Sequence, residues 1–191
     1  MRWRPSRSNT LLTMSSVDTC TGLLPELKPR YVMGVGYPED LLVSVALGAD
    51  MFDCVWPTRT ARFGNALTPA GPITLKHARY ATDFTPVDET CSCPCCLPRD
   101  HPSGKGLGIT KAFIHHLAAK ETAGAHLLTM HNVHYLLNLM GQVRTSIIED
   151  RFPAFLWKWF RVRFGGVEGI PKWAVGALQG VGVDLLHDTP A

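Results

Sequence analysis

The stretch RYVMGVGYPEDLLVSVALGADMFDCV (Arg30–Val55) decides the fold of this chain. Its first part, Arg30–Val35, has the apolar character of a buried strand. A helix is expected over Pro38–Leu47, because proline suits the first turn of a helix and the two acids that follow suit its dipole, and Gly48 ends it. A second strand follows at Met51–Val55. Strand, helix and strand at this spacing predict the βαβ unit of a parallel sheet.

The composition limits the class of protein. The chain has 191 residues, of which 46% are hydrophobic and 18% are charged, and its formal net charge is +3. These values fit a globular domain with a hydrophobic core and exclude a disordered or collagen-like chain. Because the net charge is low, any contact with nucleic acid must come from a local basic patch. No run of 18 apolar residues occurs, so we expect no membrane span.

The segments around the βαβ unit differ in character. Residues 1–22 form a basic leader that we expect to be poorly ordered, and a transit peptide is the alternative because its first part holds arginine and serine but no acid. Residues 63–75 alternate around two glycine turns and predict a small hairpin. Residues 97–108, rich in proline and glycine, predict a mobile loop. Further helices are expected at Thr110–Lys120, from Asn132 to Pro153, from Phe155, and at Trp173–Leu186.

Four of the six cysteines lie within six residues, and three of them have the spacing Cys91-x-Cys93-x-x-Cys96. Three thiolates on a tight turn can occupy one face of a tetrahedral zinc site, so a fourth ligand, most simply a histidine, is required. His131 is favoured because it directly precedes the expected helix, whose start would hold it in place. Free thiols are the alternative interpretation. The histidines available are His101, His115, His116, His126, His131 and His134.

A carboxylate and two arginines follow the second strand. Asp53 lies at its carboxyl end, where parallel sheets place their active sites, so it is a candidate nucleophile or general base. Arg59 and Arg62 suit an anionic or purine-bearing substrate. A loop cap at Asp53, and a solvated loop or an ion pair for the arginines, are the alternatives.

Three blocks together with the cysteine motif resemble the tRNA-guanine transglycosylase family. The blocks are MGVGYPED (Met33–Asp40), DMFDCVWPTRTAR (Asp50–Arg62) and LTMHNVHY (Leu128–Tyr135). The resemblance covers roughly Lys28–Leu186 and is strongest to the catalytic subunits of eukaryotic members. It implies an α/β fold, namely the C-terminal portion of a (β/α)8 TIM-type barrel within residues 23–191, with an inserted zinc-binding lobe at about residues 76–150.

The resemblance also implies roles for individual residues. Asp53 matches the nucleophile that forms a covalent intermediate with the ribose of the wobble guanosine. Cys91, Cys93, Cys96 and His131 match the ligands of one structural Zn²⁺, which leaves Cys95 as an additional thiol. The residues that match RNA-contacting positions are Gly34, Val35, Gly36, Tyr37, Pro38, Glu39, Asp40, Thr58, Arg59, Thr60, Ala61 and Arg62.

The implied activity is exchange of the wobble guanine of tRNA for queuine. The implied partners are tRNA with a wobble guanine, queuine or guanine, and a related non-catalytic subunit in a heterodimer. The implied location is the cytoplasm, with association with the mitochondrial outer membrane.

Two departures from the family qualify these expectations. The loop at residues 97–108 is longer than the family normally has. The half of the family's barrel that precedes Lys28 is absent, and in its place stands the leader, which resembles nothing in the family. A (β/α)8 barrel needs about 250 residues, so this chain cannot close one. The half of the barrel that carries the acid/base aspartate is not matched, and we therefore expect the chain to be inactive by itself. A non-catalytic isoform that binds the partner subunit or tRNA, and an unrelated zinc-stapled interaction module, are the rival interpretations.

Overall fold

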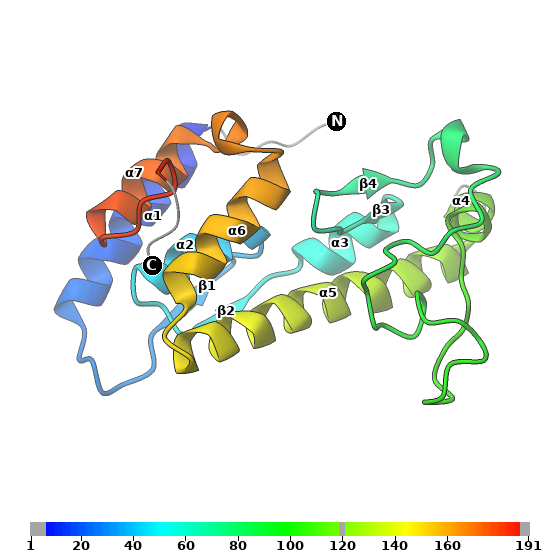
Figure 1. Cartoon of the computed structure of the whole chain (residues 1–191), viewed down its shortest axis with the longest axis horizontal. Coiled ribbons are helices and arrows are strands. Elements are labelled where there is room, and N and C mark those ends of the chain that lie inside the picture. Colours follow the sequence, from blue (N-terminus) through cyan, green and yellow to red (C-terminus); the bar gives the residue numbers. More distant parts are fainter. Residues whose placement is uncertain (1–6, 119–120, 188–191) are drawn as a thin grey trace. The chain divides into compact units, whose positions relative to one another are not determined.

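The computed structural model describes residues 7–118 and 121–187 (Figure 1). Among them, no helix is both long enough and apolar enough to cross a membrane. The elements in chain order are α1 (Arg7–Leu23), β1 (Tyr31–Met33), α2 (Pro38–Ala46), β2 (Met51–Asp53), α3 (Trp56–Arg62), β3 (Asn65–Ala66), β4 (Ile73–Thr74), η1 (Ala78–Tyr80), α4 (Lys111–Ala118), α5 (Thr122–Ile148), α6 (Phe152–Phe164), η2 (Val167–Gly169) and α7 (Lys172–Gly180).

The chain divides into two compact units. The first runs to Cys54 and resumes at Val143, and the second is Val55–Gln142. The second unit therefore begins earlier than the zinc-binding lobe that we expected at residues 76–150, since it also contains α3 and the β3–β4 hairpin.

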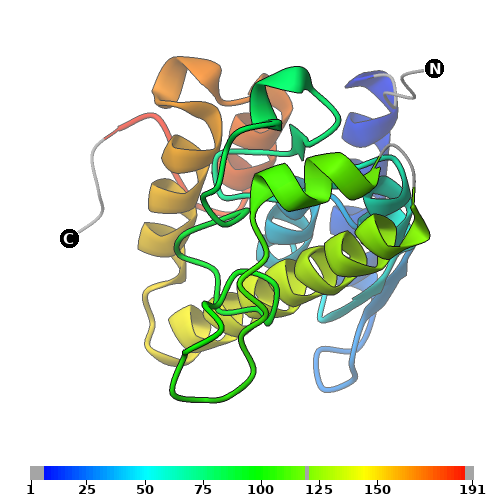
Figure 2. The same ribbon diagram turned by 90° about the vertical axis from the view of Figure 1, so that its right-hand side faces the viewer.

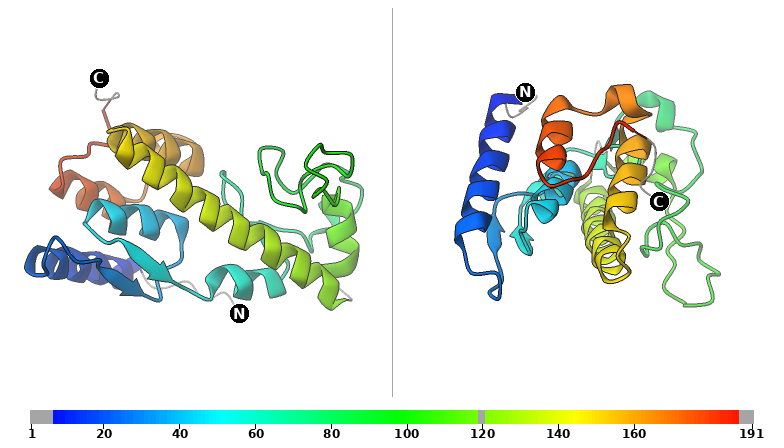
Figure 3. Two further views of the ribbon diagram at one scale, coloured as in Figure 1. Left: turned by 90° about the horizontal axis from the view of Figure 1, so that it is seen from below. Right: turned by 60° about the vertical axis from the view of Figure 1, so that its left-hand side comes forward.

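The first unit contains the expected βαβ arrangement. Strands β1 and β2 are parallel, with Tyr31 opposite Met51 and Met33 opposite Asp53, and α2 connects them (Figure 3). Each strand has three residues, fewer than the sequence predicts, because the chain turns at Gly34 (φ 77°) after β1 and α3 begins soon after β2. No further strand joins this sheet within the described residues, so the barrel implied by the resemblance is not seen.

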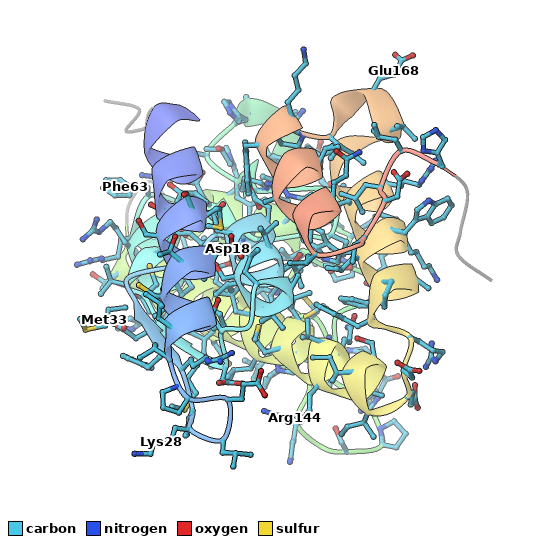
Figure 4. All side chains as sticks on the ribbon, turned by 90° about the vertical axis from the view of Figure 1, so that its left-hand side faces the viewer. Asp18, Lys28, Met33, Phe63, Arg144 and Glu168 are labelled. Atoms are coloured by element: carbon cyan, nitrogen blue, oxygen red, sulfur yellow. The ribbon has the colours of Figure 1, made fainter. Side chains whose placement is uncertain are left out.

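One face of the β1–β2 pair is open. Tyr31 and Met33 of β1 and Met51 of β2 are exposed, and Figure 4 shows Met33 projecting away from the ribbon. Val32 and Phe52 alternate with them and are half-buried. The pattern is that of strands covered on one face only.

The expectation of a poorly ordered leader is wrong for residues 7–22, which belong to helix α1; residues 1–6 lie outside the described part. Met14 and Val17 of α1 are buried, and the Thr21 hydroxyl donates to the carbonyl of Leu47 at 2.6 Å. Helices α1, α2 and α7 pack against one another. The helix was missed because its apolar stripe is short and includes a threonine, so its amphipathic signal is weak.

Helix α6 contributes buried side chains to the core of the first unit. Leu156 and Phe160 are fully buried, and the Phe160 ring packs against Trp159 and Phe164. Pro153 stands in the first turn of α6, where the missing N–H of proline costs nothing. The proline thus belongs to the start of the aromatic helix, whereas α5 already ends at Ile148, before Pro153 is reached.

In the second unit, α5 differs from the prediction in a way that affects the metal site. The sequence placed the helix start after His131, but α5 begins at Thr122, so His131 lies within the helix. The first residues of α5 include Gly124 and lack a clear apolar period, which hid them. Rigid helix on both sides holds the His131 imidazole. Figure 2 shows α4 and the cysteine-bearing loop beside α5.

The loop at residues 97–108 returns on itself. The N–H of Leu107 donates to Pro94, that of Gly108 to Leu97, and that of Ile109 to Cys95, at 2.8–2.9 Å. These hydrogen bonds tie the base of the loop to the cysteine turn, so the loop projects from one fixed base.

Candidate metal centre and strand-end carboxylate

Four buried or half-buried donor atoms converge in the second unit. The sulfurs of Cys91, Cys93 and Cys96 and a ring nitrogen of His131 all lie within 4.8 Å of one another. The three Sγ atoms are 3.6, 3.5 and 3.4 Å from Nδ1 of His131. The cysteines come from a loop and the histidine from α5, so the cluster joins segments far apart in sequence.

These distances fit a tetrahedral zinc ion. With Zn–S of about 2.3 Å and Zn–N of about 2.0–2.1 Å, neighbouring sulfur and nitrogen ligands of a tetrahedron are about 3.5 Å apart. Three thiolates and one imidazole form a closed four-ligand set, which is characteristic of structural zinc. The cluster formed by Cys91, Cys93, Cys96 and His131 is thus consistent with one structural zinc ion, and the zinc prediction is confirmed.

His131 is oriented by a second hydrogen bond. Its Nε2–H donates to the carbonyl of Leu67 at 2.8 Å, which directs the Nδ1 lone pair at the sulfurs. Burial alone lowers the pKa of His131, but hydrogen bonding to Cys91 and Cys93 raises the pKa to about 10 overall. The sulfur atoms beside Nδ1 thus favour a positive charge within the cluster, and a metal ion would supply that charge with Nδ1 unprotonated.

The thiols divide into ligands and one non-ligand. Hydrogen bonds with Cys91, Cys95 and Cys96 hold the pKa of Cys93 far below its usual range, which favours the thiolate. Cys95 is not one of the converging ligands, and its thiol donates to the carbonyl of Leu127 at 3.3 Å. Its interaction with Cys93 and its burial raise the pKa of the Cys95 thiol, so Cys95 stays neutral.

Other histidines considered as the fourth ligand have different partners. His101 Nδ1 lies 2.8 Å from the Ser103 hydroxyl within the long loop. His115 Nδ1 lies 2.8 Å from the carbonyl of Leu75. His134, one turn beyond His131, lies 3.1 Å from the hydroxyl of Ser92.

Asn132 is a site residue to which the sequence analysis gave no role. Its side chain is fully buried, its Oδ1 accepts from the N–H of Leu67 at 2.9 Å, and its Nδ2 donates to the carbonyls of Pro57 and Asn65 at 3.0 Å each. Asn132 therefore connects α5 to α3 beside the metal cluster. The available signal was its place directly after His131 in the block Leu128–Tyr135.

Helix α3 carries the second predicted RNA-contacting segment, Thr58–Arg62. The hydroxyls of Thr58 and Thr60 donate to backbone carbonyls one turn earlier, while Ala61 is buried. Arg59 and Arg62 are exposed and, three residues apart, lie on one side of the helix. Arg62 lines a cavity of about 240 Å³ together with Glu121, Thr122 and three small residues.

In the first unit, Asp53 ends β2 with an exposed carboxylate. Its Oδ1 accepts a hydrogen bond from the Tyr31 hydroxyl at 2.7 Å and a longer one from the N–H of Gly34 at 3.3 Å. The N–H of Gly34 also donates to the backbone carbonyl of Asp53 at 2.9 Å. Donation to Asp53, more than burial, raises the pKa of Tyr31 above its usual value.

The predicted segment Gly34–Asp40 forms the loop after β1 and the first turn of α2. Glu39 pairs with Arg163 of α6 at 3.4 Å, an interaction that ties this turn to the helix behind it. Burial and the neighbouring Glu39 raise the pKa of Asp40 to about 7. The two acids of this segment, Glu39 and Asp40, thus have structural roles at the start of α2. Gly34 adopts a backbone conformation that favours glycine.

A parallel βαβ unit with a strand-end carboxylate, in a chain that also holds a Cys3His centre, defines a zinc-containing α/β protein. Comparison with known proteins identifies the family: residues 8–164 match the family described as "Queuine tRNA-ribosyltransferase". The chain therefore belongs to this family of transferases that modify tRNA, as the resemblance implied. Because the match begins at residue 8, most of the leader that we expected to be unrelated lies inside it.

Comparisons with individual relatives support the same family. The chain is 55% identical over 172 residues to the queuine tRNA-ribosyltransferase catalytic subunit of Schizosaccharomyces pombe, covering 90% of this chain and 42% of the relative. It is 38% identical over 183 residues to the catalytic subunit of Caenorhabditis elegans, covering 88% and 43%. It is 50% identical over 135 residues to the enzyme of Leptothrix cholodnii, covering 70% and 35%. The chain thus spans about two fifths of the length of these relatives.

Proposed function

We propose that this chain supplies the nucleophile, the RNA-contacting segments and the structural zinc site of a tRNA-guanine transglycosylase. The reaction replaces the guanine at the wobble position of tRNA with queuine through a covalent bond between Asp53 and the ribose. The observation that carries this proposal is the exposed Asp53 carboxylate at the carboxyl end of a parallel strand, held by Tyr31 and Gly34.

A carboxylate suits this chemistry because it can trap an oxocarbenium-like sugar. A lone pair of Asp53 forms a bond to ribose C1′ while the bond from C1′ to the guanine nitrogen breaks, and guanine leaves with that electron pair and a proton from a general acid. Attack by the incoming base on C1′ then releases Asp53. Two displacements of this kind exchange one base for another with retained configuration, as in retaining glycosidases.

The RNA-contacting role falls to two segments, Gly34–Asp40 and Thr58–Arg62. The exposed guanidinium groups of Arg59 and Arg62 support contact with phosphates or base edges, because arginine binds both through paired hydrogen bonds. The zinc ion has all four positions filled by protein and is therefore structural. Its bound state keeps the cysteine turn and α5 together.

The partners follow from the family and from the names of the relatives. The substrates are tRNA with a wobble guanine and free queuine or guanine. A related non-catalytic subunit completes a heterodimer, an assignment supported by the name "catalytic subunit" given to the fission yeast and nematode relatives. The proposed location is the cytoplasm, with association at the mitochondrial outer membrane.

The test uses a chain in which this segment is joined to the remaining part of the fission yeast relative. Incubation with tRNA followed by denaturing electrophoresis should reveal a covalent protein–RNA adduct, and labelled guanine should enter tRNA. Asp53→Asn should abolish both, whereas Asp100→Asn, which removes an exposed loop carboxylate, should leave them unchanged. Normal base exchange by the Asp53→Asn enzyme would refute the proposal.

A further inference from the structure

Tyr31 and Asp53 lie diagonally across the β1–β2 pair. Met33 is directly opposite Asp53 in the register, and Tyr31 precedes Met33 by two residues on the same face. Diagonal neighbours on one face are within reach of a long aromatic side chain. The Tyr31 hydroxyl spans that distance and donates to Oδ1 of Asp53 at 2.7 Å, the usual length of an O–H···O hydrogen bond.

A second donor reaches the same oxygen. The N–H of Gly34 points at the end of β2, donating to the Asp53 carbonyl at 2.9 Å and to Oδ1 at 3.3 Å. Gly34 has a φ of 77°, and a Cβ atom there would meet nothing within 4 Å. The backbone conformation of the turn, rather than lack of space, therefore favours glycine at this position.

The two oxygens of Asp53 are consequently not equivalent. In the hydrogen bonds that the structure shows among its described residues, Oδ1 accepts from Tyr31 and Gly34, and Oδ2 accepts neither. An oxygen that donors already hold is the weaker nucleophile, because its lone pairs are engaged. The free oxygen is the one available to a carbon atom.

We infer that Tyr31 is a positioning residue that holds Asp53 by Oδ1 and leaves Oδ2 as the atom that bonds to ribose C1′. The inference rests on the proposed function. As the Oδ2–C1′ bond forms and guanine departs with the electron pair of its glycosidic bond, Oδ1 becomes the carbonyl oxygen of the resulting ester. Tyr31 keeps its hydrogen bond to that oxygen and stabilises the charge that returns to the carboxylate when the incoming base displaces it.

The first test compares kinetic constants in the joined chain described above. Tyr31→Phe should lower kcat for guanine exchange by about tenfold or more, because Oδ2 of Asp53 is no longer held in the attacking geometry, while KM for tRNA stays within about twofold. Tyr80→Phe is the matched control, since it removes a hydroxyl that accepts a hydrogen bond from Arg79 in the other unit. Its kcat should equal that of the parent.

The outcomes separate the two proposals. If Asp53→Asn retains exchange, the proposed function fails. If Asp53→Asn is inactive while Tyr31→Phe has the kcat of the parent, the proposed function stands and the role of Tyr31 is refuted. A Tyr31→Phe enzyme with unchanged kcat but a raised KM for tRNA would also refute the positioning role of Tyr31, because the tyrosine would then contribute to tRNA binding.

The second test needs no activity and uses the 191-residue chain. With ¹³C-labelled tyrosine, the Tyr31 signal is assigned as the one lost in Tyr31→Phe and is followed through an alkaline titration by NMR. Asp53→Asn should lower the pKa of Tyr31 towards the usual value of about 10, because the carboxylate that holds the phenol proton is gone. An unchanged titration would show that the hydrogen bond is absent, and the inference would fail.

Discussion

His131 and Leu67 connect the metal centre to the backbone of the β3 hairpin. The Nε2–H of His131 donates to the Leu67 carbonyl at 2.8 Å, while the Leu67 N–H donates to Oδ1 of Asn132 at 2.9 Å. Adjacent residues of α5 thus bind both polar groups of one residue, and Asn132 also reaches Pro57 in α3. The metal centre therefore helps to fix the helix that carries Arg59 and Arg62.

We expect one zinc ion per chain, bound through Cys93 and its three co-ligands. Cys93→Ser should lower the zinc content and destabilise the second unit, because Cys93 is fully buried in the hydrophobic cluster of that unit. Cys95→Ser should leave the zinc content unchanged. The measurement is metal analysis after dialysis, together with thermal unfolding. Loss of zinc in Cys95→Ser, or full zinc in His131→Ala, would contradict the ligand assignment.

Replacing Asn132 with alanine should strongly destabilise the chain. The substitution leaves the buried Leu67 N–H without its acceptor and removes a donor from the carbonyls of Pro57 and Asn65, of which Pro57 keeps the Thr60 hydroxyl. A buried polar group that loses its partner costs about 1–3 kcal/mol. Urea denaturation should show a loss of several kcal/mol in the free energy of unfolding. Asn138→Ala, at an exposed position of the same helix, is the control and should change stability by less than about 0.5 kcal/mol. Equal stabilities would contradict the role given to Asn132.

The sequence predicted the elements whose signals are local. The proline and acids in the first turn of α2 and the glycine after it predicted that helix, and the spacing of Cys91, Cys93 and Cys96 predicted the metal site. The βαβ unit followed because its strands and helix alternate at short, regular distances. Together with the resemblance, these features also identified the family.

The remaining features depend on tertiary contacts. Helix α1 buries Met14 and Thr21 against neighbours that the sequence does not reveal, so a weakly patterned segment is ordered. The start of α5 was hidden because the residues before His131 lack a clear apolar period. The pairing of Tyr31 with Asp53 needs the register of two parallel strands, which no local pattern specifies.

Stability should depend on pH through Asp40. Burial and Glu39 raise its pKa to about 7, well above the usual value for aspartate. Between about pH 4 and 7 the folded chain therefore holds more protons than the unfolded chain, and this group makes stability fall as the pH rises. Asp40→Asn should remove this slope and be more stable than the parent at pH 8, as measured by urea denaturation across pH. Asp18→Asn, at an exposed position, should follow the parent; an identical slope in Asp40→Asn would disprove the prediction.

Arg59 and Arg62 should contribute to tRNA binding without affecting the fold. Both are exposed on α3, so Arg59→Ala and Arg62→Ala should change stability by less than about 0.5 kcal/mol. Each should weaken tRNA binding by the joined chain and reduce the slope of log affinity against log salt by about one if it contacts a phosphate. Lys105→Ala in the long loop is the control. Unchanged affinity and salt slope in both arginine variants would contradict the RNA-contacting role of α3.

The 191-residue chain by itself should not exchange bases. The reaction needs a nucleophile, a group that transfers protons to and from the purines, and a pocket for the purine ring, and only the nucleophile has a counterpart in our assignments. General acid–base catalysis contributes roughly 10²–10⁴-fold in rate, and positioning of the reactants about 7–11 kcal/mol, so losing both should put turnover below detection.

The open sheet strengthens this expectation. Asp53 stands on one of two short strands, and the face of this pair that carries Tyr31, Met33 and Met51 is exposed, so few neighbours fix the position of the carboxylate. The check is incorporation of labelled guanine into tRNA by the purified chain, with the joined chain as the positive control. Clear incorporation by the purified 191 residues would refute the prediction, because they would then supply the proton-transfer group and the purine pocket themselves.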